Sequence, residues 1–385
     1  MKYLILIIFA FLNLNLNLNG QTPELGKADE LFSNKEYISS KEIYYKNLDQ
    51  LSPKQLANLG FCHFMEKEND EAVKYFKKSA EQEDPTGQRY LGFAYEKGIE
   101  PLEKDLSKAI EFYKKAADQN DNIATSNLGY YYFNGLGVPK DYELAFKFYS
   151  KAAELGNPRA MNNLGDMYEN GIYITRNLEK AYNLYVESAE NEDVYGITNL
   201  AELYEEGIYV EKNIIEAIKL YEQAANKNHA AAQNSLGVIY LYGNGVEQDY
   251  KKAYEWFDKA ANQLEITAMV NIGRMHRLGL GVEKNYELAL KILNYAAVNG
   301  NIYGQYELAN MYYNGEGMDK DFETAMKIYK AAGNKGFAEA QANIAYMYEN
   351  GEGVEVNLVE AIRWYELAAN QGHKYSIDKI NELKK

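Results

Sequence analysis

The sequence predicts an all-α fold, an α-solenoid in which antiparallel helix pairs stack one after another. Three observations predict it: a motif that recurs about every 36 residues, a glycine after the first half of each unit, and a small–large apolar pattern in the second half. One helix pair of this length cannot bury its apolar face alone, so neighbouring units must stack.

A small residue, Gly or Ala, marks the first helix of each unit. One step between copies is 37 residues and the other six are 36, and a shorter unit with Gly60 comes first. The copies are Gly92, Gly129, Gly165, Ala201, Gly237, Gly273, Ala309 and Ala345. A tyrosine follows three residues later in every full unit except one, where His276 replaces it.

A second series of glycines lies six residues after the small residue. It comprises Gly98, Gly135, Gly171, Gly207, Gly243, Gly279, Gly315 and Gly351. Because glycine adopts the left-handed conformation without a Cβ clash, the series predicts the C-terminal end of each first helix.

The second helix begins at an aspartate or asparagine whose side chain can accept bonds from free first-turn N–H groups. These residues are Asp105, Asp141, Asn177, Asn213, Asp249, Asn285, Asp321 and Asn357. An alanine follows after four residues and a large apolar residue after four more, as in Ala145 and Tyr149. A spacing of four places both on one helical face, which predicts close packing against the first helix.

The combined pattern resembles the Sel-one-like repeat, a relative of the tetratricopeptide repeat. It reads LGxxYxxGxGV, then D/N-xxxA, an aromatic residue and Ala-Ala, as in Asn127 to Ala153. The resemblance covers residues 54–373, as one short and eight full units. It implies a right-handed superhelix and a non-enzymatic scaffold for protein–protein contacts, in exported bacterial proteins or the eukaryotic secretory lumen. The family's disulfide-stapled, cysteine-rich branch is disfavoured, because Cys62 is the chain's one cysteine.

The two ends depart from the repeat. Lys2, an apolar run over residues 3–12 and the small residue Gly20 predict a signal peptide at 1–20, and therefore export to the periplasm or secretion. This run is too short to span a bilayer stably. Residues 21–53 are expected to form a degenerate capping helix pair, and residues 374–385 a closing amphipathic helix.

Composition and motifs exclude several classes of function. The net charge of −15 disfavours a nucleic-acid partner, since an acidic surface repels phosphates. The four histidines lack metal-ligand spacing and no serine lies in GxSxG, so neither a cofactor nor catalysis is expected. A monomeric protein-binding scaffold is the leading hypothesis. A cell-envelope hydrolase and a carbohydrate binder using some of the 36 tyrosines remain alternatives.

The expected binding surface is a concave groove lined by the first helices. Its positions lie three residues before, one after and four after the small residue, and they vary between units. Exposed aromatic residues and arginines are typical of binding hot spots, so Tyr130, Phe133, Tyr313 and Tyr346 are the foremost candidates. The remaining predicted contacts are Phe93, Asp166, Glu169, Glu202, Glu205, Leu241, Arg274, Arg277 and Tyr306.

Overall fold

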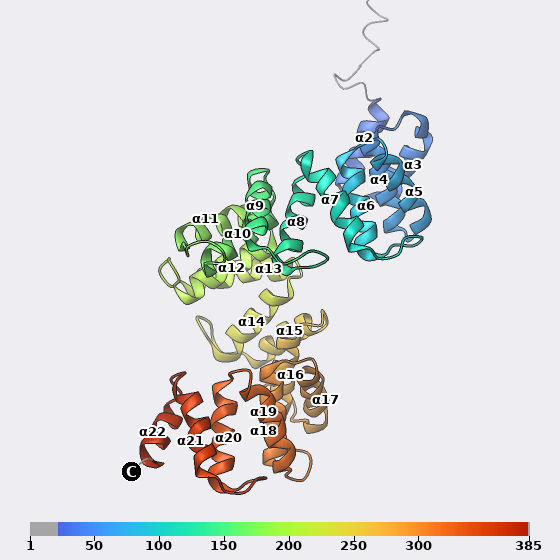
Figure 1. Ribbon diagram of the computed structural model, residues 1–385. Helices are drawn as coiled ribbons and strands as arrows, with labels where there is room; N and C mark the ends of the chain where they lie inside the picture. The colour runs from blue at the N-terminus through green and yellow to red at the C-terminus, as the bar shows by residue number, and fades with distance from the viewer. Residues whose placement is uncertain (1–21, 384–385) are drawn as a thin grey trace, which may run out of the picture. The chain divides into compact units, whose positions relative to one another are not determined.

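The computed structural model describes residues 22–383, so the predicted signal peptide lies outside the described residues. This part of the chain consists of α-helices and one short 3-10 helix, and it contains no strand (Figure 1). Successive helices pack against each other in pairs. The prediction of an all-α fold of stacked helix pairs is confirmed.

The described chain divides after Gly196 into two compact units. The first contains α2 (Pro23–Ser33), α3 (Tyr37–Lys46), η1 (Leu48–Gln50), α4 (Pro53–Met65), α5 (Asn69–Ala80), α6 (Pro85–Lys97), α7 (Leu106–Asp118), α8 (Asn122–Asn134), α9 (Tyr142–Glu154), α10 (Pro158–Asn170) and α11 (Leu178–Glu190). The boundary falls inside α12 (Val194–Glu206).

The second compact unit continues the same alternation of first and second helices. It contains α13 (Ile214–Asn226), α14 (Ala230–Tyr242), α15 (Tyr250–Ala261), α16 (Ile266–Leu278), α17 (Tyr286–Val298), α18 (Ile302–Asn314), α19 (Phe322–Gly333), α20 (Ala338–Asn350), α21 (Leu358–Ala369) and α22 (Lys374–Leu383). The last helix, α22, packs against α21, and Lys379 forms an ion pair with Glu349 of α20 at 2.9 Å.

The predicted caps are present at the helix ends. Asp141 accepts a hydrogen bond from the Leu144 N–H at 2.9 Å, and the matching Asp or Asn does the same in every full unit. The predicted glycines end the first helices in the left-handed conformation, with φ of 64° at Gly171 and 74° at Gly279. Local sequence therefore sets both the start of each second helix and the end of each first helix.

The core of each repeat is the contact between the small residue and the large one. A Cβ atom at Gly165 would lie 2.6 Å from Cε1 of Tyr185, and one at Gly237 would lie 2.5 Å from the Phe257 ring. Both rings are buried. The second-helix ring thus rests directly on the backbone of the first helix, which brings the two helices close together.

Candidate functional site

The thirteen predicted contact residues have different environments. Tyr130, Glu202 and Tyr346 are exposed, and most of the others are half-buried. Leu241 is only 3% exposed and belongs to the core around Phe257, so its prediction as a surface residue is wrong. Leu241 packs into the core of its own repeat. The sequence prediction assigned every copy of this position to the surface, so it missed this difference.

Several predicted acidic contacts are hydrogen-bonded to buried tyrosines of the second helix. The Tyr185 hydroxyl lies 2.6 Å from an oxygen of Asp166 and 2.8 Å from an oxygen of Glu169, so its single proton is shared between the two carboxylates. Tyr221 likewise donates to Glu205 at 2.7 Å. Burial raises the pKa of Asp166 to about 6, the charge of Glu169 adds to the rise, and the Tyr185 bond opposes it. These carboxylates therefore have an internal structural role.

The residue four positions after the small residue follows the second-helix ring only in part, because Phe133 accompanies Tyr149 and Tyr313 accompanies Tyr329 without a carboxylate. A glutamate also pairs with the tyrosine in two further units, Glu96 with Tyr113 and Glu349 with Tyr365, each at 2.7 Å. Where the ring lacks a hydroxyl, the position holds no carboxylate: Leu241 accompanies Phe257, and Arg277 accompanies Leu293. Part of the variation attributed to ligand contact is thus explained by packing within the repeat.

The two predicted arginines are neutralised by neighbouring carboxylates. Arg277, whose side chain is 10% exposed, pairs with Glu307 at 3.1 Å and with Glu316 at 3.2 Å. Arg274 donates to the Tyr242 hydroxyl at 2.6 Å and lies 3.7 Å from Glu307. Both side chains therefore link consecutive repeats.

Aromatic packing similarly occupies other predicted contacts. Phe93 lies edge-on to Phe64, and Phe133 lies edge-on to Tyr142. Tyr306 packs edge-on against Phe337. Each ring is half-buried, so only part of it is available to a partner.

Two predicted aromatic contacts come together in one pocket of the second compact unit. Tyr313 of α18 and Tyr346 of α20 line a cavity of about 460 Å³, which we call the carboxamide pocket. Three asparagines and four further residues complete its lining: Asn310, Asn314, Asn343, Tyr329, Ala342, His373 and Tyr375. The Tyr313 hydroxyl donates to Glu352 at 2.6 Å, which fixes the ring at the pocket edge.

The pocket combines groups that bind polypeptides well. An asparagine side chain can donate and accept hydrogen bonds, as a peptide backbone does, and tyrosine rings provide rigid contact area. Asn310 already accepts a bond from Tyr329, and His373 is bonded to Ser376 at 2.8 Å. Within the described residues, no cluster of His, Cys, Asp and Glu could hold a metal ion. The arrangement suits binding.

The sequence prediction missed the three asparagines, although Asn310 lies one residue after the small Ala309, at a position of the predicted groove. Asn314 has counterparts in Asn134, Asn170 and Asn350. Asn343 lies two residues before the small Ala345. The same position holds Asn127, Asn163, Asn199 and Asn271 in other units. A recurring polar residue at a half-buried position of the first helix could therefore have indicated this side of the pocket.

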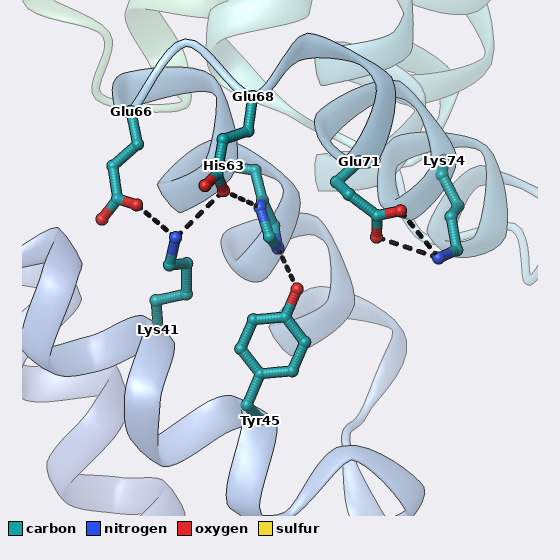
Figure 2. Close-up of polar contacts among 7 residues, drawn as sticks. All are labelled: Lys41, Tyr45, His63, Glu66, Glu68, Glu71 and Lys74. Carbon is teal, nitrogen blue, oxygen red and sulfur yellow. Dashed lines mark hydrogen bonds and ion pairs between the residues drawn. The ribbon is translucent and has the colours of Figure 1, made fainter.

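A second polar cluster joins the N-terminal helices to the first repeat (Figure 2). His63 contacts Glu68 at 2.6 Å and the Tyr45 hydroxyl at 2.8 Å. Lys41 forms ion pairs with Glu66 and Glu68. Burial raises the pKa of Tyr45 to about 12, so the phenol keeps its proton near neutral pH. The contacts join α3 to α4 and to Glu68, which directly precedes α5, and we call this cluster the clasp.

Fold and site together define a helical-repeat protein, whose units are consecutive helix pairs. The chain belongs to the Sel1 repeat family. The family model matches nine segments, at residues 56–84, 85–121, 123–157, 158–193, 194–229, 230–263, 266–301, 302–337 and 338–373. Repeats of this family serve generally as protein–protein interaction scaffolds.

Solved structures of the same fold agree with this assignment. A protective antigen of uropathogenic Escherichia coli with an SLR fold is 28% identical, covers 94% of this chain and 79% of its own, and has a TM-score of 0.66. A Sel1 repeat protein of Oxalobacter formigenes is 28% identical, covers 80% of this chain and 89% of its own, and has a TM-score of 0.51. The comparison with curated proteins produced no match. In the described part of the chain, no helix combines the length and apolarity needed to cross a membrane.

Proposed function

We propose that this chain is a non-enzymatic scaffold or adaptor that binds a protein or peptide on its first helices. The carboxamide pocket provides the main anchor. The observation that carries the proposal is the meeting of Tyr313 and Tyr346 with Asn310, Asn314 and Asn343 around one cavity. An extended segment can exchange backbone hydrogen bonds with the asparagines while its side chains contact the rings.

The test is selection of random peptides displayed on phage against the full mature chain. Selected peptides are expected to lose about 5- to 30-fold in affinity for Asn343→Ala and Tyr346→Ala, the loss produced by about 1–2 kcal/mol. Tyr173→Ala is the matched control, because Tyr173 is likewise an exposed tyrosine but belongs to the other compact unit. Equal binding by all variants would exclude the pocket as the anchor.

The same purified protein distinguishes the two alternatives. Binding to isolated glycans without peptide binding would favour a carbohydrate-binding protein. Release of products from cell-wall material, abolished by heat denaturation, would favour an envelope hydrolase.

We also propose that the chain is exported, on the basis of the apolar segment at residues 3–12, and that it acts as a monomer. Mass spectrometry of the protein recovered from periplasmic or culture fractions should find Gln21 as the first residue. An intact Met1 in the cytoplasmic fraction would contradict export.

A further inference from the structure

Two apolar side chains protrude from the second helices of the second compact unit. Leu264 follows α15 and is 69% exposed, and Val298 ends α17 and is 79% exposed. Tyr295, one turn before Val298, is 48% exposed. Exposed apolar side chains that gather in one patch indicate an interaction site, whereas single exposed apolar residues do not.

The other repeats act as internal controls for these two positions. Where α17 has Val298, the other full units have only polar residues: Asp118, Glu154, Glu190, Asn226, Asn262, Asn334 and Asn370. Where Leu264 lies, they have Asn120, Gly156, Glu192, Asn228, Gly300, Gly336 and Gly372. Leu264 has a φ of 64°, in the left-handed region that a leucine adopts unfavourably. The apolar residues are thus specific to these repeats and are not needed for the turn.

Both residues line one surface depression, which we call the α15–α17 groove. It has a volume of about 780 Å³ and is bounded by α15, α16 and α17. Its apolar lining comprises Tyr254, Ala261, Leu264, Met269, Ile272, Leu288, Ile292, Tyr295 and Val298. A neighbouring depression of about 690 Å³ shares Leu288, Lys291 and Asn294 with it, so the surface continues across α17.

The two edges of the groove carry opposite charges. Asp258 lies on the α15 edge and Lys291 on the α17 edge. Asp258 accepts a bond from the Asn262 amide at 3.1 Å, and neither charge forms an ion pair among the described residues. A partner can therefore place a basic group over α15 and an acidic group over α17.

We propose that the α15–α17 groove binds an amphipathic helix of a partner protein. The apolar face of that helix packs between α15 and α17, against Leu264, Tyr295 and Val298. One flank presents Lys or Arg to Asp258, and the opposite flank presents Asp or Glu to Lys291. A third helix laid along two others is a common packing arrangement, and helix-in-groove recognition uses such apolar anchors.

The geometry favours a helix over other occupants. Leu264 and Val298 protrude from the surface, so they suit insertion into a partner's apolar face better than enclosure of a small molecule. A second copy of this chain is disfavoured by mutual repulsion, because each copy carries a net charge of −15. The groove lies on the second helices α15 and α17 and on the first helix α16, and it shares no residue with the carboxamide pocket of the proposed function.

The test is a phage library of amphipathic helices, randomised at the apolar and flanking positions and selected on the full mature chain. Selected helices should carry a basic and an acidic flank. They should bind Leu264→Gly/Val298→Asn at least tenfold more weakly than the wild type. These substitutions restore residues used by other repeats, so the variant should fold, as circular dichroism can verify.

Two further variants make the result decisive. Asp258→Lys/Lys291→Glu should reject the selected helices and accept versions with exchanged flanks. Tyr346→Ala should leave binding unchanged, and a loss of binding in this variant would assign the helices to the carboxamide pocket.

The proposal is overturned if no selected helix depends on Leu264 and Val298. It is also overturned if the same substitutions instead abolish self-association or binding of a fatty acid.

Discussion

In several repeats the hydroxyl of a buried tyrosine needs a hydrogen-bond acceptor, and a side chain of the first helix provides it. Tyr221 is fully buried, and its hydroxyl reaches Glu205 at 2.7 Å, at the helix surface. The equivalent pair one unit later, Phe257 and Leu241, packs without any polar group. The array thus contains both a hydrogen-bonded and an apolar version of the same contact.

This comparison predicts a double-mutant cycle at the first of these pairs. Tyr221→Phe should lower the free energy of unfolding by about 1–2 kcal/mol, because Glu205 loses its donor. Tyr221→Phe/Glu205→Leu should recover most of that loss, because it reproduces the Phe257–Leu241 pair. Urea denaturation followed by circular dichroism measures both values. A double variant as unstable as the sum of its single variants would contradict this explanation.

A second residue-scale prediction concerns Asp166 and acid stability. Burial raises its pKa from 3.8 to about 6 in the folded chain, so the folded state binds more protons than the unfolded state between these values. The contribution of Asp166 to stability is therefore greatest below about pH 4 and is lost as the pH rises through 6. Asp166→Asn should remove that part of the pH dependence, which urea denaturation at pH 4 to 7 can measure. An unchanged pH profile would show that Asp166 is not the responsible group.

At the scale of helices, the separation within a pair is set by the residue under the second-helix ring. A Cβ atom at Gly165 would lie 2.6 Å from Tyr185, closer than real Cβ contacts allow. Other units carry Ala201, Ala309 or Ala345 at this position, so those pairs accommodate a methyl group there.

Two glycine substitutions should have opposite effects for this reason. Gly165→Leu should destabilise the fold by about 1–3 kcal/mol or more, because the ring and the backbone must separate. Gly26→Ala, inside α2, should stabilise by about 0.5–1 kcal/mol, since a Cβ there meets open space and alanine favours the helix. Thermal and urea denaturation measure both. A neutral Gly165→Leu would contradict the close approach.

At the scale of the whole molecule, stability comes from packing between neighbouring helices and not from covalent links. Cys62 is the chain's single cysteine, and it is buried in the core between the capping helices and the first repeat. Burial raises the pKa of its thiol to about 12, so little reactive thiolate forms at neutral pH.

Thiol labelling should therefore report opening of the N-terminal end. Cys62 should react slowly with a thiol reagent in the folded protein and rapidly in urea. Disruption of the clasp by His63→Ala should raise the labelling rate, whereas an exposed substitution such as Lys74→Ala should not. Fast labelling of the wild type would show that this end is open in solution.

Much of the candidate site could not be read from the sequence, for a physical reason. The repeat register selected Tyr313 and Tyr346 for the first-helix face, and both line the carboxamide pocket. The same register also selected Leu241 and Arg277, because it treats every copy of a position alike. Whether a given copy of this position is exposed depends on its contacts with the second-helix ring and with the next repeat. These are tertiary contacts.

The sequence by itself determined the helix pairs, their caps and the glycines under the packed rings, because these depend on residues within one 36-residue period. Only the tertiary structure decided which carboxylates face a tyrosine hydroxyl and which arginines are paired. It also brought Leu264 and Val298 to the two sides of one groove. These contacts join residues from different helices, whose distances a periodic pattern does not specify.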